Sequence, residues 1–306
     1  MAIDTVKVTV NGTTVTAVSN GDGTYTATLA APNVTSYNVN SGHYYPVTVI
    51  ATNMAGTATT VNDQTDTLGT YLRLRVLEVT APTITVTSPT SGQYFGTANP
   101  EIKFTLSDDA NGSGVAISTL KIIVDNKTYT NTSSGVTVTT TSNGYSVSCI
   151  PSTALADGSH TVKIEVEDND GNAAASSSIS FITDTIAPTL NVTNPAQSGT
   201  YVANAALTVA GTTSDSTSGA PTIKITLNGS DQGAVTVANG SFNKGVTLIS
   251  GANTIVITAT DKAGRVTTIT RTITLDTSSP VVASVVIDPN PVNIGENYTV
   301  TIKVTG

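Results

Sequence analysis

The sequence predicts an all-β protein made of tandem β-sandwiches, and composition, periodicity and repetition each lead to this prediction. The chain has 306 residues, of which 11% are charged and 5% aromatic, with no Trp. Thr, Val and Ile are abundant, and β-branched residues favour pleated strands over helices. Apolar and polar residues alternate throughout, whereas a sustained helical spacing of apolar residues does not occur. A chain of this length predicts several domains.

Charge and hydropathy exclude several kinds of partner. The net charge of −8 argues against nucleic-acid binding, which requires a basic surface. No apolar run is long enough to span a membrane, so we expect no membrane insertion. The start, MAIDTVKVTVNG, has neither the basic nor the apolar region of a signal peptide and leads directly into a strand. Cys149 alternates with Tyr145 and Val147, which predicts a buried packing thiol.

Each module is predicted to open with a short strand flanked by prolines. The matching segments are TAPTITVTSPTSGQYFG from Thr80, IAPTLNVTNPAQSGTYV from Ile186 and SSPVVASVVIDPNPVNIGENY from Ser278. Because Pro cannot donate to a ladder, these residues suit an edge strand or a linker. The segments recur at about 100 residues, which is the size of a β-sandwich module.

A second repeated strand lies in the middle of each module. Its alternating apolar residues correspond across the repeats, in the order Val6, Val8, Val10; Leu120, Ile122, Val124; Ile223, Ile225, Leu227. Asn11-Gly12 and Asn228-Gly229 follow two of these strands. Asn-Gly is a strong signal for a two-residue turn, so each strand is predicted to fold back as a hairpin.

A third repeat closes each module with a hairpin. YPVTVIATNMAGT, HTVKIEVEDNDGN and NTIVITATDKAGR align without a gap. Their turns open on Asn53, Asp168 and Asp261 and reach a glycine three residues later. An Asx residue at the first position and Gly at the fourth predict a type I turn.

These motifs together resemble bacterial immunoglobulin-like repeats. The shared pattern is AP, a short strand, a second Pro and a Gly-x-Tyr, ending on a strand with D-x-A-G. The resemblance covers essentially the whole chain and implies tandem immunoglobulin-like β-sandwiches. Such repeats occur in surface adhesins, in accessory modules of secreted enzymes and in bacteriophage virions, so the fold leaves the function open.

The repeats divide the chain into segments 1–80, 81–185, 186–277 and 278–306. The segments 81–185 and 186–277 contain every repeated strand and are predicted to be complete. The segment 1–80 begins at the strand of Val6, so we expect an immunoglobulin-like module that lacks its first strands. The segment 278–306 contains the first two strands of a further module.

The incomplete segments at the two ends predict assembly by strand complementation. In ENYTVTIKVTG one face of a strand carries Tyr298, Val300, Ile302 and Val304. An isolated hairpin with an apolar face is marginal in water and invites pairing at its edges. We expect it to complete the module around Val6, Val8 and Val10 of a neighbouring subunit. Such head-to-tail pairing is heterologous and gives a ring or a filament.

Three other outcomes remain open for these segments. The first module could fold alone, the tail could pack on the segment 186–277, or a different protein could supply the missing strands.

An acidic run in the second module is the best candidate for a metal site. EVEDNDGN resembles the calcium loops of cadherin-like repeats and contains Glu167, Asp168 and Asp170. Carboxylates in a turn suit a hard cation. The aspartate at position 168 recurs in the other hairpins, whereas the neighbouring acids do not. Turn formation therefore explains Asp168 without a metal, and calcium is the alternative.

Other candidate sites are weaker. Asp108 and Asp109 in LSDDANGSG form another acidic loop. His43 and His160 lie in different modules, and a zinc site needs more ligands at close spacing. We expect both histidines on the surface. No nucleophile motif accompanies them, so we expect no catalytic residues, no cofactor and no enzyme activity.

We expect a structural virion protein that decorates the head, neck, tail or baseplate. The Met start without an export signal and the resemblance lead to this expectation, with assembly in the host cytoplasm. Its partners would be itself, other virion proteins and, weakly, cell-surface glycans. The alternatives are a secreted or surface fibre or adhesin, and carbohydrate-binding accessory modules of a secreted enzyme.

Carbohydrate binding would need exposed aromatic platforms. The candidates are Tyr37, Tyr44, Tyr45, Tyr94 and Tyr201, and we expect the last two to be core or junction residues. Arg73 and Arg75 alternate with leucines, which predicts a solvated strand, with an acidic partner as the alternative.

Overall fold

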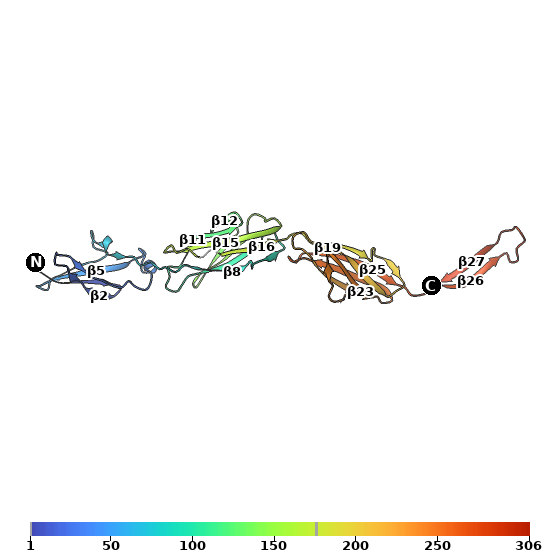
Figure 1. Ribbon diagram of the computed structural model, residues 1–306, viewed down its shortest axis with the longest axis horizontal. Helices are drawn as coiled ribbons and strands as arrows, with labels where there is room; N and C mark the ends of the chain where they lie inside the picture. The colour runs from blue at the N-terminus through green and yellow to red at the C-terminus, as the bar shows by residue number, and fades with distance from the viewer. Residues whose placement is uncertain (1, 175–176) are drawn as a thin grey trace. The chain divides into compact units, whose positions relative to one another are not determined.

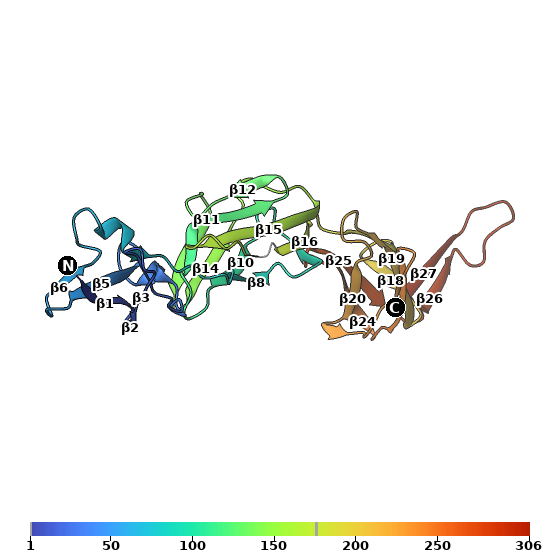
Figure 2. The same cartoon turned by 60° about the vertical axis from the view of Figure 1, so that its left-hand side comes forward.

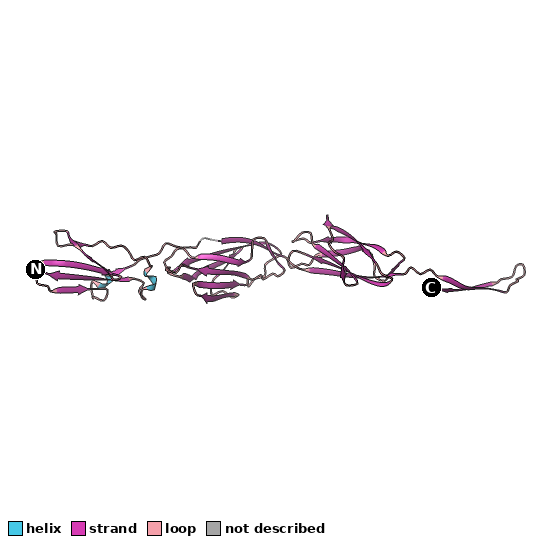
Figure 3. Cartoon of the chain, turned by 90° about the horizontal axis from the view of Figure 1, so that it is seen from below, coloured by secondary structure: helices cyan, strands magenta, loops and turns pink. Residues whose placement is uncertain are grey.

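The computed structural model describes residues 2–174 and 177–306. In this part of the chain the regular structure is almost entirely strand, and the short 3₁₀ helices η1 (Ser36–Asn38) and η2 (Gly69–Tyr71) lie near the N-terminus (Figure 3). The all-β prediction is therefore confirmed. The chain divides into the compact units Met1–Thr183 and Asp184–Gly306. No helix among the described residues is long and apolar enough to cross a membrane.

The first module, within 2–80, is built around a sheet with the order β2-β1-β5-β6, and β7 also pairs with β5 (Figure 1). Asn11 and Gly12 have φ of 47° and 78°, the left-handed conformation that a two-residue hairpin turn requires. β3 and β4 pair with each other as a short separate hairpin. The strands are β1 (Ile3–Val10), β2 (Thr13–Thr16), β3 (Val18–Ser19), β4 (Tyr25–Thr26), β5 (Tyr45–Asn53), β6 (Ala58–Val61) and β7 (Arg73–Leu74).

The second module is a sandwich in which a sheet β13-β14-β10-β8 packs on a sheet β12-β11-β15-β16-β9. Figure 2 shows these sheets as separate layers. The strands are β8 (Thr83–Ser88), β9 (Gln93–Phe95), β10 (Ile102–Ser107), β11 (Val115–Val124), β12 (Lys127–Tyr129), β13 (Val136–Thr141), β14 (Gly144–Cys149), β15 (Gly158–Asp168) and β16 (Ser177–Thr183).

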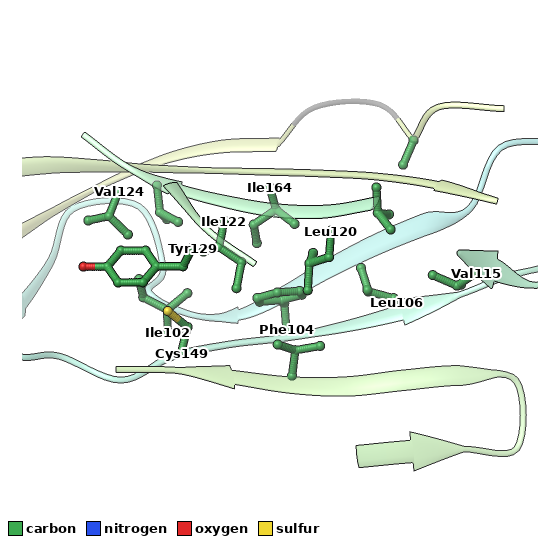
Figure 4. Packing of buried hydrophobic residues seen from close by; sticks show 14 of the residues in the cluster. Ile102, Phe104, Leu106, Val115, Leu120, Ile122, Val124, Tyr129, Cys149 and Ile164 are labelled. Atoms are coloured by element: carbon green, nitrogen blue, oxygen red, sulfur yellow. The ribbon is translucent and has the colours of Figure 1, made fainter. Parts of the chain in front are cut away.

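The core of the second module lies between these sheets. Phe104 and Leu106 of β10 point toward Leu120 and Ile122 of β11 (Figure 4). All four side chains are at most 1% exposed. Alternation in each strand places one residue set in this layer and the other in solvent, as the sequence pattern predicts.

The third module repeats this architecture, with sheets β17-β19-β23-β22 and β18-β25-β24-β20-β21 around a second core. Its strands are β17 (Thr189–Asn194), β18 (Thr200–Val202), β19 (Ala206–Ser214), β20 (Thr222–Leu227), β21 (Ser230–Asp231), β22 (Val237–Ala238), β23 (Ser241–Thr247), β24 (Gly251–Thr260) and β25 (Val266–Leu275).

The C-terminal segment is a hairpin of β26 (Val281–Asp288) and β27 (Thr299–Thr305), which pair with each other. Every residue from 276 to 306 is exposed. The hairpin therefore has no core of its own within the described chain.

The pairing registers of the three modules coincide at the repeated strands. Val8 pairs with Val49, Ile122 with Ile164, and Ile225 with Ile257. The hairpins that follow close in the same way, because the N–H of Gly56, Gly171 and Gly264 donates to the carbonyl of Asn53, Asp168 and Asp261 at 2.9, 3.3 and 3.3 Å. Residues can therefore be compared between modules position by position.

Candidate functional site

The first module presents an apolar sheet face that its own residues cover incompletely. Val6 and Val8 of β1 and Val47 of β5 are half-buried, and Val10 is 8% exposed. In the second and third modules, the residues equivalent to Val8 are Ile122 and Ile225, and both are 0% exposed. Among the described residues, the compact apolar clusters lie in the second and third modules. The face of β1 and β5 thus has the chemistry of a core without the opposing layer.

The complete modules show which strands cover the equivalent sheet face. In the second module the β13–β14 pair continues through β10 to β8, and in the third the β22–β23 pair continues through β19 to β17. β3 and β4 occupy the corresponding place in the first module, but no further strand pairs with β4 in the part of the chain that the structure describes. The edge of β4 is where a β10-like strand would add.

The C-terminal hairpin can be compared with the first-strand pairs of the complete modules. β26 pairs with β27 antiparallel, as β8 pairs with β10, and Val281 lies opposite Thr305 as Thr83 lies opposite Ser107. The register shift falls at Val282 and Ser284 in the hairpin and at Lys103 and Phe104 in the second module. Counted back from these ends, Val304 stands at the position of Leu106.

The core-facing side of this hairpin is exposed. Val300, Ile302 and Val304 are 45%, 57% and 56% exposed, whereas their equivalents Ile102, Phe104 and Leu106 are 0%, 1% and 1% exposed. The residues opposite them on β26 are also apolar and exposed: Val282, Val285 and Ile287. Tyr298, which precedes β27, is 57% exposed.

The acidic run singled out from the sequence serves the turn and the contact between the first two modules. Asp168 is 2% exposed, and its Oδ1 accepts the N–H of Asp170 and Asn172 at 2.9 and 2.8 Å. The other oxygen, Oδ2, accepts the amide of Asn172 at 2.7 Å. Asp170 Oδ2 accepts the hydroxyl of Thr35 at 2.5 Å and the N–H of Glu78 at 3.1 Å. Hydrogen bonds thus occupy both oxygens of Asp168 and one oxygen of Asp170.

The remaining acidic candidates differ in their surroundings. Glu167 is exposed. Asp108 is 7% exposed, and its Oδ2 accepts the N–H of Gly114 at 2.7 Å. Asp109 is exposed and its Oδ1 accepts the N–H of Asn111 at 2.9 Å. These bonds are those of loop-forming aspartates.

The expected surface position of His160 is wrong. Its side chain is buried, with Nδ1 2.8 Å from Asp125 Oδ2 and Nε2 2.8 Å from the Ala156 carbonyl and 3.0 Å from Thr183 Oγ1. Partners for both ring nitrogens make burial tolerable. His43 is half-buried and stacks on Tyr37, with ring centroids 4.1 Å apart.

The tyrosine candidates fall in unexpected places. Tyr45 is 5% exposed and donates its hydroxyl to the Val34 carbonyl at 3.2 Å, so it belongs to the interior. Tyr201, expected in a core or junction, is 71% exposed. Tyr94 is half-buried. Tyr44 donates to Asp63 Oδ2 at 2.9 Å and lies 4.9 Å below the Arg73 guanidinium, so Arg73 packs locally on an aromatic ring.

Cys149 is the buried packing thiol that the alternation of β14 predicts. It is 0% exposed in the core of the second module (Figure 4). Burial raises the pKa of its thiol to about 11. A thiol in this environment is chemically inert under ordinary conditions.

Two family models match separate parts of the chain. Residues 97–185 match the bacterial Ig-like domain, and residues 188–277 match domain B of glucodextranase. No curated protein matches the sequence.

Among solved structures, the fibronectin(III)-like modules of Clostridium thermocellum CbhA are 20% identical over 63% of this chain and 94% of theirs, with a TM-score of 0.42. A tetra-tandem repeat from the extending region of a large adhesion protein is 19% identical over 99% of this chain and 80% of its own, with a TM-score of 0.32. Part of a 1.5-MDa bacterial ice-binding adhesin is 21% identical over 89% and 86%, with a TM-score of 0.32. At these identities the likeness concerns the fold.

The chain is thus built from tandem immunoglobulin-like β-sandwiches, parts of which match bacterial families of this fold.

Proposed function

We propose that this protein is a non-catalytic structural subunit of an extracellular fibre, joined head to tail by β-strand complementation. The observation that carries the proposal is the correspondence between the exposed apolar face of β26–β27 and the uncovered face of β1 and β5. The donor would be a second copy of this chain, because its hairpin pairs antiparallel and begins with the same pairing as the first-strand pair of the second module.

Burial supplies the driving force for this joint. Burying an exposed Val or Ile side chain contributes about 1.5–3 kcal/mol. Val300, Ile302 and Val304 would lie over Val8 and its neighbours as Ile102, Phe104 and Leu106 lie over Ile122 in the second module. Pairing of β27 with the edge of β4 would add ladder hydrogen bonds, as in other β-augmented complexes.

The outer face of the hairpin supports the same orientation. Thr301, Lys303 and Thr305 alternate with the apolar residues of β27. Their equivalents on β10, Lys103 and Thr105 among them, are exposed in the complete sandwich. On β27 one face is apolar and the other polar, as expected for a strand of an outer layer. On β26 the outer face also exposes Val281 and Val286.

The place where such a fibre functions is a further part of the proposal. Tandem sandwiches suit a spacer on a cell surface or in a secreted fibre, and the adhesin modules above share this fold. A virion location, with other virion proteins as partners, stays a prediction from the sequence.

Carbohydrate binding is a second candidate, favoured by the match of residues 188–277 to glucodextranase domain B. Tyr201 within this region is 71% exposed, and exposed aromatic rings are the usual platforms for sugar rings. A glycan array with the intact chain tests this, and binding that survives Tyr201→Ala would contradict a role for this ring.

The assembly proposal is tested by light scattering of the full chain across concentrations. We expect wild-type chains to form oligomers that grow with concentration. Ile302→Lys places a charge on the apolar face and should leave monomers. Thr301→Lys introduces the same side chain on the opposite face of β27 and should assemble as wild type does.

A mixing experiment tests the head-to-tail polarity. Val8→Lys disrupts the acceptor, which is the sheet face of β1 and β5, and leaves the donor hairpin of β26 and β27 intact. Ile302→Lys disrupts the donor hairpin and leaves the acceptor intact. A mixture of these variants should form heterodimers and stop there, because one donor and one acceptor remain. Monomeric wild-type chains at high micromolar concentration, or Ile302→Lys chains that still assemble, would contradict the proposal.

A further inference from the structure

Three aspartates converge in the unit Asp184–Gly306, although they are far apart in the sequence. Asp184 precedes β17, Asp215 follows β19, and Asp261 opens the turn between β24 and β25. One carboxylate oxygen from each lies within 4.8 Å of the others. Oxygens bound to one calcium ion at about 2.3–2.6 Å are at most about 5.2 Å apart. The three carboxylates are therefore spaced to contact one ion of this size.

Two of these carboxylates are buried, and each has one oxygen without a hydrogen-bond partner. Asp184 is 0% exposed and Asp261 is 7% exposed. The Oδ2 atoms of both, together with the buried hydroxyl of Ser218, have no hydrogen-bond partner among the described residues. A buried carboxylate oxygen without a partner is costly, and a bound cation removes that cost.

The hydrogen bonds that do exist fix the aspartates without neutralising them. Asp215 Oδ1 accepts the N–H of Thr217 and Ser218 at 2.8 and 2.7 Å. Asp261 Oδ1 accepts the N–H of Arg265 at 2.8 Å. Each bond holds one oxygen and leaves the other for a ligand.

The second module contains an acidic cluster at the equivalent position, and there the protein itself supplies more of the hydrogen-bond partners. Glu78, Asp108 and Asp168 occupy the corresponding loop, strand end and turn. There the N–H of Ser113 donates to Glu78 Oε1, and both oxygens of Asp168 accept hydrogen bonds. Among the carboxylate oxygens of Glu78, Asp108 and Asp168, only Glu78 Oε2 is buried without a hydrogen-bond partner in the described chain.

We propose that Asp184, Asp215 and Asp261 bind a divalent cation of the size of calcium. The ion would take one oxygen from each carboxylate, and water or the Ser218 hydroxyl would complete the six to eight ligands that calcium usually holds. The site ties the segment before β17 to the loop after β19 and to the β24–β25 turn, so it would stabilise the third module. This inference is independent of the assembly proposal.

Asp261→Asn is the sharpest variant for a test. Asn53 stands at the equivalent position of the first module and makes the same turn, accepting the N–H of Ala55 and Thr57 at 2.9 and 3.0 Å. The substitution should therefore keep the turn and remove one ligand charge. Asp231→Asn is the matched control, because exposed Asp231 also caps a turn, accepting the N–H of Gly233 at 2.8 Å.

The experiment is calcium titration of the chelator-treated full chain by calorimetry, with thermal unfolding in parallel. We expect wild type and Asp231→Asn to bind calcium and to unfold at a higher temperature with it. Asp261→Asn should bind at least about tenfold more weakly, because ligand charge sets affinity. Without calcium, the Asp261→Asn variant should be no less stable than wild type, because the substitution relieves repulsion between the carboxylates.

Two results would overturn the site. One is the absence of both binding heat and thermal shift for wild type at millimolar calcium. The other is an unchanged calcium response in both Asp261→Asn and Asp184→Asn, which would place any bound ion elsewhere. Magnesium serves as the size control, because it forms shorter bonds of about 2.0–2.1 Å and demands near-octahedral geometry.

Discussion

At the scale of single residues, burial sets the chemistry of each reactive group. The buried His160 contacts Asp125, whose side chain is 40% exposed. Burial by itself raises the pKa of Asp125, but hydrogen bonds from His160 and the N–H of Thr161 outweigh it and hold the pKa below the ordinary 3.8. The ionised form of Asp125 thus stabilises the second module.

Asp125→Asn should lower the free energy of unfolding by about 1 kcal/mol at neutral pH, a modest loss because water screens the partly exposed carboxylate. Because the pKa of Asp125 is lower in the folded than in the unfolded state, its contribution to stability is fully present above about pH 4. That contribution is lost as the pH falls through the pKa of the folded state. The variant and wild type should therefore converge once the pH lies below the pKa of Asp125 in the folded protein. Urea unfolding across pH measures this, with Glu167→Gln as an exposed control; a difference that persists in acid contradicts it.

Cys149 should resist thiol reagents in the folded protein. Its pKa of about 11 leaves almost no thiolate near pH 8, and the core excludes the reagent. Ser146→Cys, on the exposed face of the same strand, should react at once and provide the control. Rapid labelling of native wild-type protein would show that the second module opens readily.

At the scale of elements, repetition made the hairpins predictable while contacts between distant loops were not. The turns at Asn53, Asp168 and Asp261 follow from local Asx and Gly chemistry, and the strands follow from period-two alternation. The burial of His160 depends on Asp125 and Thr183, which only the folded sheet brings near. Likewise, the carboxylate cluster of Asp184 spans three separate loops, whereas the sequence pattern favoured the neighbouring acids Glu167, Asp168 and Asp170.

The β15–β16 turn also joins the first module to the second. Asp170→Ala removes the acceptor for the Thr35 hydroxyl and the Glu78 N–H, so the segment around Glu78 should open more often. Hydrogen exchange of the Glu78 amide should accelerate by about tenfold, since bonds to charged groups contribute on the order of 1.5–3 kcal/mol and water replaces part of that. Exchange in the β24–β25 turn should stay unchanged, and an unaltered Glu78 amide would contradict the role of Asp170.

At the scale of the whole molecule, the second and third modules differ from the two end segments in how much apolar surface they bury. Each complete module buries its own apolar residues, as Ile122 and Ile257 at 0% exposure show. The end segments instead carry apolar faces that are covered incompletely, with half-buried Val6 and Val8 on one and exposed Ile302 and its neighbours on the other. The alternation of both strands was readable from sequence, but the degree of exposure required the structure.

The preformed pairing of β26 with β27 has a consequence for fibre length. If every subunit contributes one finished donor hairpin and one acceptor sheet, any linear chain of subunits ends with a vacant acceptor at one tip and an unused donor at the other. Growth then contains no intrinsic stop, and supply of subunits or a separate terminator sets the length. A truncated chain that ends before Val281 would act as such a terminator, since it accepts a hairpin and offers none.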